Sequence, residues 1–593
     1  MTIGDQSAEA SALYDQFVAA GTCQAILTSF QHLCDSLDIH PTDEEWFYQT
    51  LKSKLTNWKA NSLWTRLDKR FNHREYAGHK ACATTRVLVI GAGPCGLRAA
   101  IECKLLGARV VVVEKRDRFS RNNVLHLWPF VIHDLKSLGA KVFYPKFCAG
   151  SIDHISIRQL QCVLMKICLL LGVEIYTNVG YEDLQEPSPE VSGEPGNAEQ
   201  RGWRAKVSPP DHPVSCYDFD VLIGADGKRN TLQGFSRKEF RGKLAIAITA
   251  NFINHQTTEE ARVEEISGDL KAETGIDLEN IVYYKDDTHY FVMTAKKQSL
   301  LEKGVLLQDH RDTIKLLSRD NVDQQALQNY AREAADVSTN HKLPNLEFAH
   351  NHFGQPDIAM FDFTSLFAAE NSSRAMERYG RKLLINIVGD SLLEPFWPTG
   401  SGCARGFLGS FDAAWAVKSW ASGSMSPLQV LAERESVYML LSQTTPESLS
   451  KSFNSYTINP ITRYKHCNTQ ALKCIQVRQL YDTTEIINID DLEPVEIPAK
   501  RARTYDIMVD QGRLLRWCNR KLALLPSHVC VSSLSAILSL LSCLLADAMK
   551  LSSKCYDVFF THHSSLVHNA TPDLKLEFAS YMCSFGRFPR NIQ

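Results

Sequence analysis

Apolar and polar positions follow three different patterns along this chain. From residue 8 to about residue 70, apolar side chains recur every three or four positions, which predicts amphipathic helices. Short continuous apolar runs at 86–90, 110–113, 221–224 and 383–388 predict strands of a parallel sheet with helices on both faces. The alternating strands of 244–252 and 281–293 predict a mostly antiparallel sheet.

The first strand run leads directly into a glycine-rich turn. Gly91, Gly93 and Gly96 stand between this strand and an apolar helix run that reaches Leu106, and the next strand run is followed by Glu114. In a dinucleotide-binding βαβ unit the first glycine permits the tight turn, and the second lets the backbone approach a pyrophosphate. The third lets the helix pack on the strand, and the acid binds a ribose diol. The motif predicts nucleotide binding and leaves FAD and NAD both open.

Two later segments favour FAD. The strand run ending at Gly224 is followed by Asp226, and the run ending at Val388 is followed by Asp390 and a glycine-rich helix start. Asp390 can bind ribityl or ribose hydroxyls while the free N–H groups of the helix face the pyrophosphate or the flavin. One such turn alone is an ordinary turn, but the three in this order resemble flavin hydroxylases of the p-hydroxybenzoate hydroxylase type. No second GxGxxG unit follows a strand, so we expect NADPH to bind without a Rossmann domain of its own.

Longer stretches resemble the MICAL family of actin-oxidising flavin monooxygenases. The resemblance runs from about residue 10 to about residue 490, and its most specific parts are 114–128, 153–160, 240–252 and 283–293. It implies an α/β fold: a Rossmann-like FAD domain of the p-hydroxybenzoate hydroxylase type, an inserted mostly antiparallel sheet subdomain and a helical N-terminus. It also implies NADPH-dependent oxidation of actin methionines to the sulfoxide and F-actin disassembly, with H₂O₂ as side product. A thioether needs no deprotonation, so no nucleophile–base pair is expected.

The resemblance assigns site residues and domains. The expected FAD contacts are Gly91, Gly93, Cys95, Gly96, Glu114, Lys115, Arg116, Arg121, Asn123, Tyr181, Asp226, Tyr290 and Asp390. Trp397 and Asn123 are the candidate catalytic residues, because Trp397 matches an aromatic beside the isoalloxazine and Asn123 is expected near the same ring. The expected domains are a helical segment 1–80, an FAD-binding subdomain 81–225 with 380–490, a sheet subdomain 226–379, a linker 491–512, and a partial calponin-homology-like start with a divergent tail 513–593.

Charge and cysteine content limit the cellular compartment and the partners that we expect for this chain. A net charge of −2 over 593 residues gives no overall attraction to nucleic acid or membrane. Seventeen cysteines without paired spacing, and a start without a signal-peptide pattern, predict a reduced intracellular protein without a metal. The resemblance implies a cytoplasmic protein associated with the actin cytoskeleton. The basic run Lys500–Arg503 adds the nucleus as a second candidate location. Basic residues between Lys52 and Lys80 form either a solvated face, which we favour, or a positive patch that meets F-actin. We expect a monomer.

Two departures from the family pattern leave functional alternatives open. A short aromatic segment that the family has after Gly268 is missing, which puts activity in doubt. From Leu522 to Ala546 the chain has no charged residue, and this stretch is a weak candidate for a membrane span. We favour a divergent C-terminal end instead. The alternatives to the monooxygenase are a catalytically silent regulator and a small-molecule aromatic hydroxylase.

Overall fold

The computed structural model describes residues 3–41, 47–150, 152–188, 201–263, 270–343, 345–395, 397 and 400–485, which all belong to one unit, 1–495. Three of the sequence predictions lie wholly or mainly outside these residues: the junction after Gly268, the linker, and the divergent tail with its uncharged stretch. No helix in the described part is long and apolar enough to cross a membrane.

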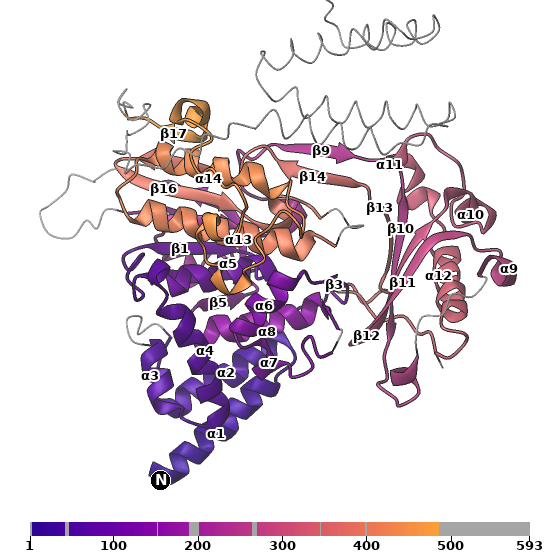
Figure 1. The fold of residues 1–593 in the computed structure, drawn as a ribbon, viewed down its shortest axis with the longest axis horizontal. Coiled ribbons are helices and arrows are strands. Elements are labelled where there is room, and N and C mark those ends of the chain that lie inside the picture. Colours follow the sequence, from indigo (N-terminus) through magenta and orange to yellow (C-terminus); the bar gives the residue numbers. More distant parts are fainter. Residues whose placement is uncertain are drawn as a thin grey trace, which may run out of the picture. The chain divides into compact units, whose positions relative to one another are not determined.

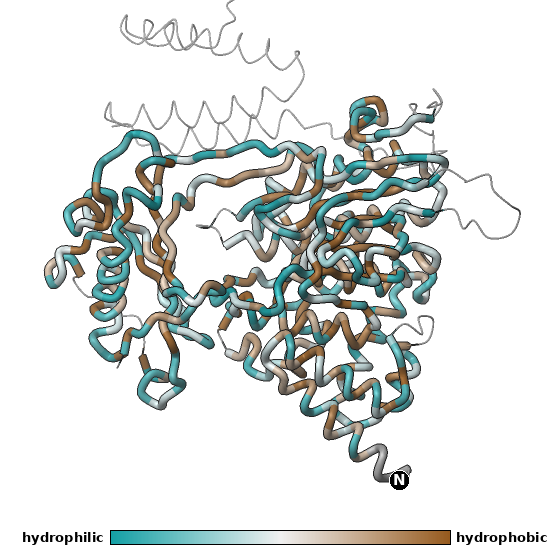
Figure 2. The backbone as a smooth tube through the Cα atoms, turned by 180° about the vertical axis from the view of Figure 1, so that it is seen from behind, coloured by the Kyte–Doolittle hydropathy of each residue, from teal (hydrophilic) through white to brown (hydrophobic). Residues whose placement is uncertain are grey.

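Helices precede the first strand, as the helical spacing predicts. They are α1 (Ile3–Ala19), α2 (Cys23–Leu37), α3 (Phe47–Lys54) and α4 (Trp58–Phe71). The side chains of Thr22 and Asn57 accept the N–H groups of Ala25 and Ala60 and so cap α2 and α4. Hydrophobic and hydrophilic residues alternate along these helices (Figure 2), and most of the hydrophobic ones are buried in the main core, although Trp58 on α4 is exposed.

A seven-stranded sheet forms the centre of the FAD-binding part, in the order β17-β15-β16-β8-β1-β2-β5 (Figure 1). Its strands are β1 (Arg86–Ile90), β2 (Arg109–Glu114), β5 (Glu174–Thr177), β8 (Val221–Gly224), β15 (Ser373–Arg378), β16 (Arg381–Ile387) and β17 (Tyr481–Thr483). Five neighbouring strands, from β16 to β5, run parallel, and β15 is antiparallel to β16. The continuous apolar runs are explained because strands covered on both faces need apolar side chains on both.

Helices α5 (Pro94–Leu105), α8 (Ile157–Leu170), α13 (Gly402–Ala421) and α14 (Pro427–Leu441) pack on this sheet and on one another. Shorter elements connect them: β3 (Val124–His126), β4 (His154–Ser156), α6 (Pro129–Ser137), α7 (Ala140–Phe143), β6 (Gly180–Gln185) and β7 (Arg204–Ser208). The 3-10 helices are η1 (Arg74–Tyr76), η2 (Pro213–Cys216), η3 (Gly227–Arg229), η4 (Glu260–Arg262), η5 (Arg319–Asn321), η6 (Gly389–Ser391), η8 (Phe453–Ser455), η9 (Pro460–Thr462) and η10 (Cys474–Leu480).

The inserted part is an antiparallel sheet with its own hydrophobic core. Its strands are β10 (Ile246–Ile253), β11 (Leu278–Lys285), β12 (Thr288–Ala295) and β13 (Ile358–Asp362), in the order β11-β12-β10-β13, with helices α9 (Leu270–Thr274), α10 (Lys297–Glu302), α11 (Thr313–Leu316) and α12 (Gln324–Ser338). The run 281–293 is a hairpin of β11 and β12, because the polar pair Asp286–Asp287 turns the chain. The α/β fold with an inserted antiparallel sheet and a helical N-terminus is confirmed.

The inserted sheet is tied to the FAD-binding part in two ways. The chain passes between them through a two-stranded ribbon of β9 (Arg237–Arg241) and β14 (Ser365–Ala369), which spans the two parts in Figure 1. In addition, the β11–β12 turn is bound by polar contacts: Asp286 accepts the Ser156 N–H at 2.8 Å, and Asp287 pairs with Arg158 at 2.8 Å.

Candidate cofactor cleft

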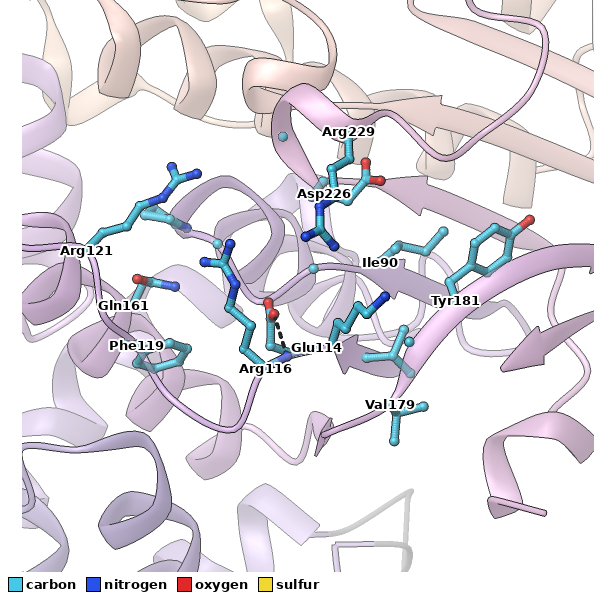
Figure 3. Close-up of a pocket in the computed structure, with 18 of the residues that line it drawn as sticks. Ile90, Glu114, Arg116, Phe119, Arg121, Gln161, Val179, Tyr181, Asp226 and Arg229 are labelled. Atoms are coloured by element: carbon cyan, nitrogen blue, oxygen red, sulfur yellow. Dashed lines mark hydrogen bonds between the residues drawn. The ribbon is translucent and has the colours of Figure 1, made fainter. Parts of the chain in front are cut away.

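A cleft lies at the carboxyl ends of β1, β2 and β8 (Figure 3), the edge of a parallel sheet where ligands bind. It is lined by the turn after β1, the segment after β2, the start of α8, the start of β6 and the turn after β8. The lining residues are Ile90, Gly91, Gly93, Pro94, Val113, Glu114, Lys115, Arg116, Arg118, Phe119, Ser120, Arg121, Ile157, Gln161, Val179, Gly180, Tyr181, Ala225, Asp226, Gly227, Arg229 and Thr231.

The three glycines of the turn meet different steric demands. Gly91 has φ +100°, and a Cβ there would lie 2.6 Å from the carbonyl oxygen of Ala225. A Cβ on Gly96 would lie 2.1 Å from the carbonyl oxygen of Gly91, so α5 can approach the turn this closely only with a glycine at position 96. At Gly93 the nearest atom to a Cβ is 3.8 Å away, and no side chain caps the first turn of α5. The open space beside Gly93 and the free N–H groups of α5 fit a pyrophosphate.

Glu114 holds the glycine turn in place. Its two carboxylate oxygens accept the N–H groups of Ala92 at 2.9 Å and Arg116 at 3.0 Å, and each keeps a lone pair for a ribose hydroxyl. The side-chain amide of Gln161, on α8, donates to the carbonyl oxygen of Ala92 at 2.9 Å. Gln161 was not predicted, because α8 carries other polar residues, Arg158, Gln159 and Lys166, and nothing in the sequence distinguishes Gln161 from them.

Cationic side chains surround the open side of the cleft. Lys115, Arg116 and Arg121 follow β2 as predicted, and Arg229, which was not predicted, enters from η3. In Figure 3 the guanidinium groups of Arg116 and Arg229 point into the same open space. Positive charge at this place suits a bound phosphate ester.

Asp226 lines the cleft and also fixes the turn after β8. One carboxylate oxygen accepts the Thr231 N–H at 2.8 Å, and the other lies 3.2 Å from the Ser391 hydroxyl. That hydroxyl is also 2.9 Å from the carbonyl oxygen of Gly227. Asp226, a predicted FAD contact, therefore joins the turn after β8 to η6, which follows β16.

Cys95, on α5, lies against η6 and α13 of the third cofactor segment. A Cβ on Gly389 would be 3.0 Å from the Cys95 Cβ, and one on Gly406 would be 2.4 Å from its Sγ. The Ser410 hydroxyl, on α13, donates to the Cys95 carbonyl oxygen at 2.9 Å. Burial raises the pKa of the Cys95 thiol to about 12, so the sulfur stays neutral. This geometry fits a packing role for Cys95 and leaves little room for a larger side chain.

Asp390, on η6, is largely enclosed near the cleft. Burial raises the pKa of its carboxyl, and the positive charge of Arg121 opposes this rise. The backbone carbonyl oxygen of Asp390 accepts a hydrogen bond from Arg237 at 2.8 Å. A carboxyl in this setting can accept or donate a hydrogen bond to a sugar hydroxyl, which suits the predicted ribityl contact.

Three other predicted site residues, Asn123, Tyr290 and Trp397, lie apart from the cleft lining. Asn123 donates from its amide to the phenol oxygen of buried Tyr290 at 3.1 Å. Trp397 is half-buried, with its ring centroid 5.0 Å from that of Phe361 on β13. Tyr181 does line the cleft, on β6. The cleft thus gathers the adenosine and pyrophosphate candidates, while the flavin-side candidates lie at contacts between the FAD-binding part and the inserted sheet.

The described residues contain no group of three or more His, Cys, Asp or Glu side chains placed to hold a metal ion. The described cysteines are free thiols.

Comparisons with known proteins agree with this geometry. An FAD-binding domain family model matches residues 86–125, and the family model "Mical, Rossman domain" matches residues 244–362. Mouse "[F-actin]-monooxygenase MICAL3" is 59% identical over 527 residues, which are 86% of this chain and 26% of that protein. Zebrafish "Protein-methionine sulfoxide oxidase mical3a" is 59% identical over 532 residues, 88% of this chain and 26% of that protein.

Rat "[F-actin]-monooxygenase MICAL2" is 57% identical over 535 residues, 87% of this chain and 27% of that protein. The chain thus spans about a quarter of the length of these relatives. Among solved structures, a 2-methyl-3-hydroxypyridine-5-carboxylic acid oxygenase is similar with a TM-score of 0.39 and 15% identity, over 60% of this chain and 87% of that one.

Proposed function

Because this chain belongs to the MICAL family of flavoprotein monooxygenases, we propose that it binds FAD in the cleft and oxidises methionine side chains of F-actin to the sulfoxide. The observation that carries the proposal is the contact of α5 with η6 and α13 at Cys95, Gly389 and Gly406, beside a glycine turn held by Glu114. The relatives' names supply actin and methionine as substrates.

The protein's own residues bind and orient the cofactor. Gly93 and the start of α5 hold the pyrophosphate, Glu114 the adenosine ribose, and Asp390 the ribityl chain. Bound FAD supplies the transfer of two electrons from NADPH to O₂. Overall, one oxygen atom enters the thioether, the other leaves as water, and NADPH becomes NADP⁺ with uptake of one proton.

The substrate sulfur is neutral and carries no proton that must be removed. The reaction therefore needs positioning and exclusion of water, without a general base acting on the substrate. Tyr290 and Trp397 lie where the inserted sheet meets the FAD-binding part, and we assign them to the wall of the substrate side. Without a thioether in reach, O₂ would be reduced to H₂O₂.

The proposed activity also suggests an oligomeric state, a cellular location and an effect on actin filaments. We propose that the chain acts as a monomer in the cytoplasm, on actin filaments, and that Lys500–Arg503 provides a route to the nucleus. Its effect on filaments would be disassembly, because the sulfoxide makes an apolar contact residue polar.

The decisive experiment uses the full chain. A yellow protein with stoichiometric flavin, NADPH oxidation stimulated by F-actin, and actin methionines that gain one oxygen in mass spectrometry would support the proposal. Catalase controls for free H₂O₂. Stimulation by phenols and not by F-actin would identify an aromatic hydroxylase, and bound flavin without NADPH oxidation would identify a silent regulator.

A further inference from the structure

Two consecutive asparagines hold the segment after β2 against the inserted sheet. The Asn122 amide donates to the Asp357 carboxylate at 2.8 Å, and the Asn123 amide donates to the Tyr290 phenol at 3.1 Å. Asp357 directly precedes strand β13, and Tyr290 lies on β12. The two neighbouring side chains therefore bind different strands of one sheet, so the backbone that carries them is held at two points.

Asp357 is held in turn by a buried asparagine on β10. The Asn251 amide nitrogen donates to the same carboxylate oxygen, Oδ2, at 3.1 Å, and the Asn251 amide oxygen accepts the Thr288 hydroxyl at 2.9 Å. Asn251 and Thr288 are both buried. Because a hydroxyl donor occupies its oxygen, the Asn251 amide has one preferred orientation and presents a donor to Asp357.

The carboxylate of Asp357 is thus shared between the two parts of the fold. The Asp357 backbone belongs to the inserted sheet, since its N–H donates to the Ala349 carbonyl oxygen at 2.7 Å and its carbonyl oxygen accepts the Asn251 N–H at 3.0 Å. Burial raises the pKa of the Asp357 carboxyl, and the hydrogen bonds from Asn122 and Asn251 oppose this rise. Both amides therefore favour the ionised carboxylate, and hydrogen bonds to an ionised group are the stronger kind.

The segment that Asp357 holds also lines the cofactor cleft. Its residues from Glu114 to Arg121, apart from Asp117, belong to the lining. Asn122 and Asn123 follow directly, and Asn123 is the residue expected beside the flavin ring. Between β2 and β3 this segment forms neither helix nor strand, so its position depends on contacts such as these.

We propose that Asp357 is a positioning residue: together with Asn251 it holds Asn122, so that the adjoining flavin side of the cleft keeps a fixed place against the inserted sheet. The inference rests on the proposed function, because it assigns the Asn122–Asp357 contact a part in that reaction. A sheet that moved away from the segment would admit water beside the flavin. NADPH would then reduce O₂ to H₂O₂ without transfer of oxygen to sulfur, so the contact sets how much sulfoxide each NADPH yields.

The test compares Asp357→Ala, which removes the acceptor, with Asp357→Asn, which keeps one acceptor oxygen and loses the charge. The matched control is Asp323→Ala, which removes the carboxylate that accepts the Ala326 N–H at 2.8 Å and caps α12 of the inserted part. Full-length chains are measured for flavin content, unfolding temperature and the visible circular dichroism of the bound flavin. Actin methionine sulfoxide and H₂O₂ are measured per NADPH oxidised.

We expect Asp357→Ala to retain flavin, to change the circular dichroism of that flavin, and to yield roughly tenfold less sulfoxide per NADPH, with H₂O₂ in its place. Tenfold is about the equilibrium cost of one hydrogen bond to a charged group. Asp357→Asn should keep much of the yield. Asp323→Ala should lower the unfolding temperature while it keeps the wild-type yield and flavin spectrum.

A double-mutant cycle between Asn122 and Asp357 separates this contact from general damage to the fold. If the two residues act through one hydrogen bond, adding Asn122→Ala to Asp357→Ala should lower the sulfoxide yield little further. Additive losses would overturn the inference. An unchanged yield and flavin spectrum in Asp357→Ala would overturn it too, as would equal losses of yield in Asp357→Ala and Asp323→Ala.

Flavin content and the flavin spectrum keep the inference apart from the proposed function. If the wild type binds flavin but forms no actin sulfoxide, the proposed function fails, and a spectrum that changes in Asp357→Ala and not in Asp323→Ala still supports the positioning role. Loss of flavin from both Asp357→Ala and Asp357→Asn would show that the carboxylate maintains the fold of the cleft, and the inference would be wrong.

Discussion

The side-chain amide of Asn123 lies 3.1 Å from the phenol oxygen of Tyr290 and joins the segment after β2 to strand β12 of the inserted sheet. Tyr290 is fully buried, and burial raises the pKa of its phenol far above neutrality. The hydroxyl is therefore protonated at every working pH. The bond is a permanent contact between the cofactor-binding segment and the sheet proposed to cover the flavin.

Tyr290→Phe should test this contact without changing the packing of the ring. It leaves the Asn123 amide to solvent or to other partners, and we expect the free energy of unfolding to fall by about 1 kcal/mol. Asn123→Ala should cost more, because the buried phenol would lose its partner. Denaturant titration gives the stability, and NADPH oxidation with F-actin gives the activity. If both variants have wild-type stability and wild-type activity, the contact contributes to neither stability nor activity.

Gly91→Ala and Gly93→Ala should behave differently. At Gly91 the new methyl would lie 2.6 Å from the Ala225 carbonyl oxygen, at a φ of +100° that alanine rarely adopts. We expect this variant to lose several kcal/mol of stability and its flavin. At Gly93 the nearest atom is 3.8 Å away, so the fold should survive while FAD affinity falls.

Unfolding curves and flavin absorbance of the two purified proteins separate these outcomes. Equal stability of the two variants would contradict the steric account of Gly91. Full flavin occupancy in Gly93→Ala would mean that the cofactor backbone does not approach this turn.

The sequence was sufficient for the local parts of the site. The glycine turn, Glu114 and the segment after it follow one another directly, so their spacing alone predicted their place in one βαβ unit. Gln161 and Arg229 could not be found this way, because only the tertiary fold brings them to the cleft. The hairpin at Asp286–Asp287 was not predicted, although the polar run from Lys285 to His289 was a signal for a turn.

The turn that carries Asp286 should respond to pH. Burial, followed by the charge of Asp287, raises the pKa of Asp286, so the folded state prefers the protonated carboxyl. The stability that comes from this proton is present at low pH and is lost as the pH rises through the folded-state pKa. Asp286→Asn stays neutral and keeps an oxygen for the Ser156 N–H.

The unfolding temperature of Asp286→Asn relative to wild type should therefore increase as the pH rises from about 4 to about 7. Thermal unfolding at several pH values measures this difference. A difference that does not change with pH, or that shrinks as the pH rises, would show that Asp286 ionises freely in the folded protein.

Truncation should separate the cofactor unit from the C-terminal residues beyond it. Strand β17 ends at Thr483 and completes the sheet edge, where the Tyr481 hydroxyl donates to Glu377. Removing everything after residue 490 should leave flavin content and NADPH oxidation nearly unchanged, whereas removing everything after residue 478 should destabilise the unit. Loss of flavin in the longer fragment would show that later residues pack on the core.

Trp397 is the sharpest test of the flavin side. Its ring lies beside Phe361 of β13, at a contact between the inserted sheet and the segment after η6. An aromatic at the edge of the reacting ring should affect the reaction more than the affinity for the distant adenosine. Trp397→Ala should therefore keep FAD and lose actin-stimulated oxidation by roughly one to three orders of magnitude, the scale of misplacing a reacting group.

Trp397→Phe should retain part of that rate, because a flat ring still packs on Phe361. Flavin absorbance, unfolding temperature and F-actin-stimulated NADPH oxidation, measured on both variants, distinguish the two roles of the indole. If Trp397→Ala instead purifies without flavin and aggregates, the tryptophan is a core residue that holds the two parts together, and its assignment to the substrate side is wrong.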